Sequence, residues 1–328
     1  MKTLLATVGA ALTAVTLGAA EAGSEKSETT ATKNDVATAE PAAELEEEET
    51  RLFNAGFDFE FFSSYVWRNA VQTDEPVLEP GVWADFTGLD PFWFGFYVWQ
   101  NYDLTSRRHE CLKGGLTETD YGVHVGATVW QNDEETQSVD LEIGHEWFVN
   151  QQVKSEYRDD YKNTAEIYAK ATYNNPIVNV YGQASWMYDD FGSYKQGMYY
   201  ELGFNKEIEL CDSLTLGADW NVSFGDSRYL YFLYGGTASG AYYHEDEDDS
   251  YDDYASNPDS GIGGTTIKAY LAWAITDWMT LQATIAYTGV LNGSARDALE
   301  EQGPDMGWQG DCYRRDLLWG GLSLKFEY

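Results

Sequence analysis

The sequence predicts an all-β protein, a transmembrane antiparallel up-and-down β-barrel of about 12 strands, and three observations support this fold class. Hydrophobic and polar side chains alternate over most of the chain after residue 52. The connections between the alternating segments are short at one end of each segment and long at the other. The chain also begins with the composition of a secretory signal peptide.

The composition excludes several classes of protein before any motif is considered. Of the 328 residues, 16% are aromatic, and 20 Lys and Arg stand against 55 Asp and Glu, a net charge of −35. Nucleic-acid binding needs clustered basic residues, so we predict no nucleic-acid partner. Three cysteines without C-x-x-C spacing predict neither a disulfide scaffold nor a zinc site. We expect no cofactor.

The first 51 residues are predicted to precede the barrel. An apolar stretch at 4–17, followed by Ala20-Glu21-Ala22, is typical of a signal peptide, so we expect residues 1–22 to be removed. Residues 23–51 are polar and end in an acidic run, which predicts a flexible tail. The barrel is assigned to residues 52–328. A signal peptide followed by a barrel predicts the outer membrane of a double-membrane bacterium, with outer-membrane lipid around the barrel.

A hydrophobicity period of two places successive side chains on opposite faces of a strand. In the last segment Leu322, Leu324 and Phe326 share one face, whereas Ser323 and Lys325 lie on the other. The same alternation predicts strands near 53–68, 77–88, 92–104, 119–131, 138–148, 164–173, 177–188, 197–210, 214–224, 264–275, 279–290 and 319–328. Most are near the ~9 to 11 residues that a tilted strand needs to cross a bilayer.

The predicted connections favour a membrane barrel over a soluble β-sandwich. With the N-terminus on the periplasmic side, the periplasmic connections are all short, at 89–91, 132–137, 174–176, 211–213 and 276–278. The external connections are mostly longer, at 69–76, 105–118, 149–163, 189–196, 225–263 and 291–318. Bacterial outer-membrane barrels have short periplasmic turns and longer external loops. A sandwich gives no reason for this alternation.

Several local motifs resemble those of outer-membrane proteins. The terminal Phe326-Glu327-Tyr328 resembles the signal read by the barrel insertion machinery, which the resemblance implies as a partner. Residues 63–68, Ser-Ser-Tyr-Val-Trp-Arg, resemble the S-x-Y-V-aromatic-R-G pattern of the TorF-type porin family, with Asn69 in place of the usual Gly. Residues 95–99 and 139–144 are similar to later strand blocks of that family. The resemblance covers the barrel and implies a small outer-membrane pore.

Strand parity predicts a charged inner face. The residues predicted to line a pore are Asp58, Glu60, Asp85, Asp140, Glu142, Glu146, Glu166, Lys170, Glu201, Asp219, Lys268 and Lys325. Because acids predominate, we expect passive diffusion of small solutes or ions with a preference for cations. The alternative is that these acids pair with the few bases and fill a narrow lumen. Inward aromatic residues, Trp93, Tyr97, Trp99, Tyr168, Tyr181 and Tyr199, would form a stacking track or fill the lumen.

No catalytic site is predicted, although other functions stay open. The chain has four histidines, His109, His124, His145 and His244, and neither a G-x-S-x-G nor an H-E-x-x-H motif. Parity places His124 in the lumen and His145 toward lipid. An acyl hydrolase, which needs an activated nucleophile, is therefore the less favoured alternative. A non-conducting structural or adhesive barrel that acts through its external loops is another.

The long connections carry two further open questions. Cys111 and Cys312 both fall in predicted external loops, so they either form a disulfide or remain free thiols. If they form a disulfide, Cys211 at a periplasmic turn is left free. The acidic run 244–253 could bind calcium, stay solvated or fold inward to constrict a pore. We expect no other metal site. The sequence does not decide between a monomer and a trimer.

Overall fold

The computed structural model of the chain describes residues 52–105, 115–150, 163–188, 197–231, 233–234, 258–301 and 315–328. Several predictions lie outside the described residues. They are the signal peptide and acidic tail of residues 1–51, the pairing of Cys111 with Cys312, and the acidic run 244–253.

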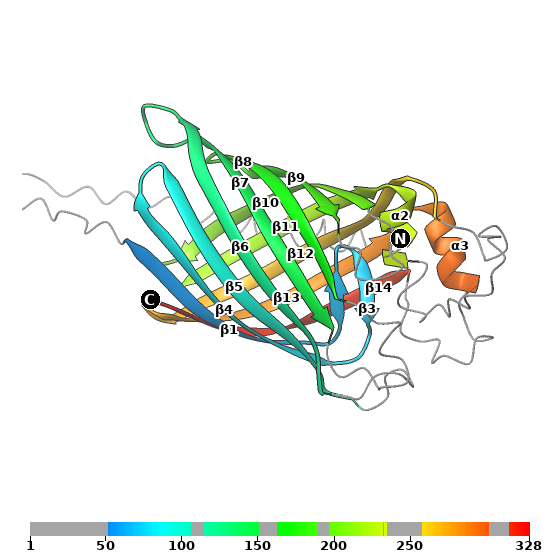
Figure 1. Ribbon diagram of the computed structural model, residues 1–328. Helices are drawn as coiled ribbons and strands as arrows, with labels where there is room; N and C mark the ends of the chain where they lie inside the picture. The colour runs from blue at the N-terminus through cyan, green and yellow to red at the C-terminus, as the bar shows by residue number, and fades with distance from the viewer. Residues whose placement is uncertain are drawn as a thin grey trace, which may run out of the picture. The chain divides into compact units, whose positions relative to one another are not determined.

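Twelve antiparallel strands form a closed barrel (Figure 1). Each strand pairs with the next wall strand along the chain, and β1 closes the barrel by pairing with both β4 and β14. The wall strands are β1 (Phe53–Phe62), β4 (Val77–Leu89), β5 (Phe92–Asp103), β6 (Gly115–Gln131), β7 (Ser138–Asn150), β8 (Thr164–Asn174), β9 (Asn179–Met187), β10 (Gly197–Cys211), β11 (Leu214–Gly225), β12 (Gly261–Thr276), β13 (Met279–Val290) and β14 (Asp316–Glu327). Closure leaves none of these twelve wall strands with an unpaired edge. The predicted fold class and strand number are confirmed.

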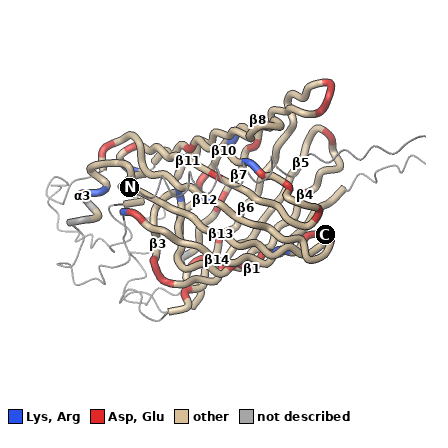
Figure 2. Tube along the Cα trace, turned by 180° about the vertical axis from the view of Figure 1, so that it is seen from behind, with Lys and Arg blue, Asp and Glu red and all other residues tan. Residues whose placement is uncertain are grey.

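The two faces of the wall differ as the period of two predicts. On β1 the exposed Phe57 and Phe59 alternate with Asp58 and Glu60. The same exposed apolar face continues around the barrel through Val82, Phe94, Phe96, Val123, Val125, Leu141, Ile143, Leu202, Phe204, Leu271, Ile285 and Leu322. An outer belt of this kind is what the hydrocarbon of a bilayer requires. Figure 2 shows acidic positions outnumbering basic ones along the chain trace.

The two ends of the barrel also differ. One end carries the short turns that join β4 to β5, β6 to β7, β8 to β9, β10 to β11 and β12 to β13, and β14 finishes there (Figure 1). In the β8–β9 turn, Asn175 Oδ1 accepts the amides of Ile177 and Val178 at 3.0 and 3.2 Å, a local bond that favours a turn over a strand. The longer connections lie at the other end, as the alternation predicted.

In the described part of the chain, two helices lie at the end with the long connections, α2 (Ser227–Tyr231) and α3 (Gly293–Glu301) (Figure 1). Each follows a polar residue that caps its N-terminus. Asp226 Oδ1 accepts the Tyr229 amide at 2.8 Å, and Asn292 Oδ1 accepts the Ala295 amide at 2.9 Å. Among the described residues, neither helix is long and apolar enough to cross a membrane.

The prediction is wrong for residues 63–76. β1 ends at Phe62 rather than at residue 68, and the predicted external loop 69–76 contains a strand. Two short strands, β2 (Tyr65–Trp67) and β3 (Ala70–Thr73), form a separate hairpin. Hydrophobic alternation predicted a strand here, but it cannot distinguish a wall strand from a strand that turns away from the wall.

The turn of this hairpin explains the unusual Asn69. Trp67 pairs with Ala70, so Arg68 and Asn69 form a two-residue loop. Their φ angles are 49° and 66°, and positive φ at both positions is the signature of a type I′ hairpin turn. Asn adopts this left-handed conformation more readily than most residues. Asn69 can therefore stand where the TorF-type pattern has Gly without loss of the turn.

Candidate functional site

The hairpin β2–β3 and helix α2 pack together within the loop end of the barrel, and we call these two elements the plug. Ala70 of the hairpin and Tyr229 and Leu230 of α2 are fully buried or nearly so. They share an apolar cluster with residues of the wall and of α3, which are Met187, Tyr199, Val290, Ala295 and Leu299. The loop end of the lumen is thus occupied by side chains from distant parts of the chain.

Arg68, at the turn of the hairpin, attaches the plug to the wall. Its guanidinium forms an ion pair with Glu166 on β8, and its Nη2 lies 3.6 Å from Glu146 Oε2 on β7. The guanidinium carbon lies 4.5 Å from the ring centre of Tyr199 on β10, and the group donates a hydrogen bond to the Tyr229 hydroxyl. The strand order places β10 across the barrel from β1 and β4, so the hairpin spans the lumen.

The Arg68 side chain is 9% exposed and that of Glu166 is 1% exposed. Burial by itself lowers the pKa of the Arg68 guanidinium, but Tyr229 and Glu146 raise this pKa above its ordinary value, and the group is charged. A buried ion pair is tolerated when further hydrogen bonds and rings surround it, as they do here. The predicted wall strand 53–68 includes Arg68, and this boundary is wrong because the residue lies at the hairpin turn.

A repeated arrangement of aromatic residue, glycine and carboxylate covers the inner wall. Tyr97 on β5 pairs with Gly122 on β6, which pairs with Glu146 on β7. A Cβ atom on Gly122 would lie 2.0 Å from Tyr97 Cε1, so the ring occupies the space that a side chain would need. The ring extends across the glycine, and its hydroxyl donates to Glu146 Oε1 at 2.6 Å. Only glycine permits this close approach.

The same arrangement recurs elsewhere on the inner face. Tyr270 on β12 crosses Gly217 on β11 and donates to Glu207 on β10. Further rings that cover a glycine of the neighbouring strand are Trp93 over Gly126, Tyr168 over Gly144 and Tyr181 over Gly203. These rings lie along the wall, which leaves the space near the barrel axis free of them. The sequence had left the choice between a stacking track and lumen filling open.

The charged residues predicted to line a pore all lie on wall strands, on the face opposite the apolar belt. Several carboxylates accept hydrogen bonds from neutral donors, which are Ser323 to Glu60 at 2.9 Å, Thr128 and Asn174 to Asp140 at 2.8 and 2.6 Å, Tyr168 to Glu142 at 2.9 Å, and Tyr181 to Glu201 at 2.8 Å. Neutral donors hold these groups without cancelling their charge. Their role in lining a pore stays a prediction.

The three inward lysines each lie beside an acid. Lys268 Nζ is 3.4 Å from Asp219 Oδ2, and the register pairs Lys170 with Glu142 and Lys325 with Asp58. Lys170 Nζ also lies 5.3 Å from the ring centre of Tyr181. Some of the acids thus lie beside a base, and the filling of a narrow lumen stays a prediction. Glu60, Asp85, Asp140 and Glu201 have no lysine or arginine in an ion pair within the described part of the chain.

Two of the four histidines are described. His124 Nε2 lies 3.0 Å from Asp85 Oδ1 on the inner face. His145 lies on the outer face, where its ring packs against Trp147 and its Nε2 contacts the Tyr188 hydroxyl. In the described ranges no group of three or more His, Cys, Asp or Glu is placed to hold a metal ion, and Cys211 is exposed and free.

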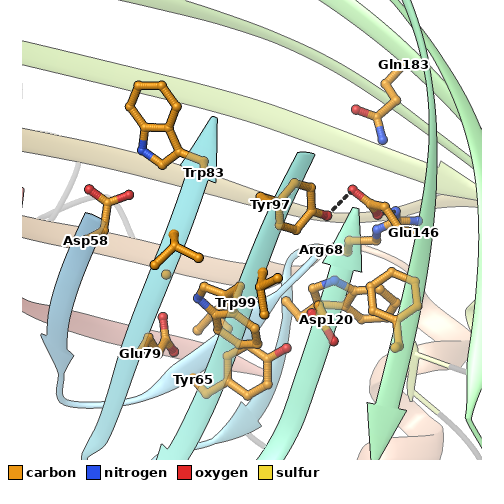
Figure 3. Close-up of a pocket in the computed structure, with 16 residues that line it drawn as sticks. Asp58, Tyr65, Arg68, Glu79, Trp83, Tyr97, Trp99, Asp120, Glu146 and Gln183 are labelled. Atoms are coloured by element: carbon orange, nitrogen blue, oxygen red, sulfur yellow. Dashed lines mark hydrogen bonds and ion pairs between the residues drawn. The ribbon is translucent and has the colours of Figure 1, made fainter. Parts of the chain in front are cut away.

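Next to the hairpin the inner face forms a pocket of about 600 Å³ (Figure 3). Four carboxylates line it, Asp58, Glu79, Asp120 and Glu146, together with the aromatic side chains of Tyr65, Trp83, Tyr97 and Trp99. The Arg68 side chain lines it as well. The sequence missed this grouping because Tyr65 and Arg68 were placed in a wall strand. The paired serines at 63–64, which interrupt the apolar alternation, were the signal for a break.

No family model matches the chain, and no curated protein matches it. Among solved structures, the chain is similar to the NanC porin, with 10% identity, coverage of 82% of this chain and 98% of that chain, and a TM-score of 0.45. The chain is also similar to an outer membrane channel from Pseudomonas putida F1, with 9% identity, coverage of 84% of this chain and 94% of that chain, and a TM-score of 0.42. For outer membrane phospholipase A from Escherichia coli the identity is 11%, the coverage is 83% of this chain and 92% of that chain, and the TM-score is 0.42. Similarities this low assign neither family nor activity, and the TorF-type resemblance stays a prediction.

Proposed function

We propose that the chain is an outer-membrane channel for passive diffusion of small solutes, with a preference for cations. One observation carries the proposal. The closed barrel has an apolar outer belt, and its inner face bears acids in excess, several of them held by neutral donors. The belt suits lipid, and a charged lumen concentrates counter-ions. In this proposal the terminal Phe326-Glu327-Tyr328 is read by the insertion machinery.

The plug modifies this proposal. Because the hairpin crosses the lumen, solutes pass beside the plug rather than along an open tube. The plug also supports a second candidate, a non-conducting barrel that acts through its external loops. The two candidates differ in conductance.

The test is single-channel recording from the refolded chain in a planar bilayer under a potassium chloride gradient. We expect discrete steps and a reversal potential on the cation-selective side. Exchange of Glu60 for Gln and of Asp85 for Asn lowers the cation preference, whereas Glu134→Gln in the exposed β6–β7 turn does not, since that turn lies outside the lumen. Absence of steps from a protein whose heat-modifiable gel mobility shows a folded barrel overturns the channel and favours the second candidate.

A further inference from the structure

We propose that the pocket beside the plug binds a small organic cation whose ammonium or guanidinium group donates N–H hydrogen bonds. The proposal rests on the proposed function, because it names the class of solute that a cation-preferring lumen would select. Its residues come from β1, β4, β5, β6, β7 and β9 and from the hairpin, and Figure 3 shows them around a common space.

The charge of the pocket is unbalanced. Four carboxylates line it against one guanidinium, that of Arg68. Arg68 is already engaged by Glu166, which lies outside the pocket, as well as by Glu146. Lys325 lies across from Asp58 on the neighbouring strand, so two positive groups stand against the four acids. Negative charge in excess of its counter-ions costs free energy in partly buried surroundings. A cation that enters the pocket removes this cost.

Asp120 provides a specific place for a donor. Asp120 is 6% exposed, it lines the pocket, and its Oδ1 has no hydrogen-bond partner among the described residues. A buried carboxylate oxygen without a donor is rare in folded proteins and is costly. This oxygen is itself shielded from water, so the N–H group of a bound cation would reach the Asp120 carboxylate where the side chain lines the pocket. A metal cation also coordinates carboxylate oxygens, so the choice of an organic cation depends on the aromatic residues of the pocket.

The aromatic residues favour an organic rather than a simple ion. Trp83, Tyr97 and Trp99 line the same pocket, and the ring of Tyr65 lies 5.4 Å from that of Trp99. Aromatic faces attract cations and also cover the apolar chain that carries an ammonium group. A volume of about 600 Å³ falls in the range of small-molecule sites. Carboxylates on several strands suit a cation with two charged ends.

The test is isothermal titration of the refolded full chain in detergent with putrescine, a diamine with four carbons. The neutral isostere 1,4-butanediol and potassium chloride are the comparison ligands. We expect putrescine to bind and butanediol not to bind at equal concentration. Asp120→Asn keeps the size of the side chain and removes its charge, and we expect the Kd to rise by about tenfold or more, since a hydrogen bond to a charged group is weakened.

Asp140→Asn is the matched control. It removes the same charge from the same inner face, but Asp140 does not line the pocket and accepts its hydrogen bonds from Thr128 and Asn174. We expect its Kd to change by less than about twofold. If Asp120→Asn does not fold, Trp83→Leu replaces it and should weaken binding through loss of a ring.

The outcomes separate this inference from the proposed function. Equal affinity in wild type and the pocket variants, or equal binding of putrescine and butanediol, overturns the site even if the protein conducts. Binding of potassium with the same dependence on Asp120 also overturns it. Binding of putrescine that requires Asp120 in a protein that does not conduct supports the site and overturns only the channel.

Discussion

The barrel wall and the plug are held in place by different kinds of contact. Apart from the closing pair of β1 and β14, each wall strand pairs with the wall strand that comes before or after it in the chain, so most of its contacts are set by hairpin register. The plug depends on contacts between distant residues, because Arg68 reaches Glu166, 98 positions away, and Asn69 accepts a hydrogen bond from Thr266, 197 positions away. The wall is therefore a product of local pattern and the plug a product of long-range packing.

The largest expected effect is on the plug, through Arg68→Met. This change leaves Glu166, which is 1% exposed, without its counter-charge. Loss of one partner of a buried ion pair costs about 3–5 kcal/mol. We expect the plug to leave its place while the wall remains folded, so that single-channel conductance rises and the gel mobility of the folded barrel is retained.

Arg296→Met is the control for this prediction. Arg296 also pairs with an acid at the loop end, Asp316, at 3.1 Å, but the two side chains are 34% and 44% exposed. Exposed pairs contribute about 0–1 kcal/mol, so conductance should not change. A similar rise in both variants, or no rise in Arg68→Met, would show that the ion pair does not hold the plug.

The second prediction concerns the outer face of the wall. Ile143 lies in the middle of β7, is 58% exposed and belongs to the apolar belt. Ile143→Arg places a charge toward hydrocarbon, at a cost of about 2–4 kcal/mol. Urea unfolding of the barrel in lipid vesicles should show this loss. Thr172→Arg puts the same residue on the inner face, where Asp140 is its cross-strand partner, and should be tolerated. Equal losses would mean that the belt does not face lipid.

The third and smallest effect concerns the inner face. Gly122→Val puts a side chain where the Tyr97 ring lies, so the ring must move and its bond to Glu146 breaks. Such overpacking costs about 1–3 kcal/mol. In a Tyr97→Ala background the same exchange should cost much less, because the space is then empty. Additive costs in this double-mutant cycle, measured by urea unfolding, would contradict the aromatic–glycine arrangement.

The sequence predicted the wall because one physical rule governs it. A side chain on a strand faces either the outer belt or the lumen, so Ile143 and Glu142 could be placed from parity alone. Turns also follow a local rule, since the side chain of a residue such as Asn175 favours hydrogen bonds to nearby backbone amides over the backbone pairing of a strand. The aromatic–glycine–carboxylate arrangement was not predicted. It depends on the register of three strands, as with Tyr97, Gly122 and Glu146, and a single strand does not contain that information.

The sequence by itself determined a barrel with an apolar outside and an acidic inside, because the alternation of side chains decides which face each residue takes. Only the tertiary structure decided that residues 65–73 leave the wall and cross the lumen. Their alternation is that of any strand, and the free energy that draws them inward comes from distant groups, Glu166 and Tyr229 on Arg68. The pocket exists for the same reason. The alternation of side chains predicts which residues of the wall face the pocket. The boundary that the plug gives the pocket depends on contacts between residues far apart in the sequence, which no local pattern contains.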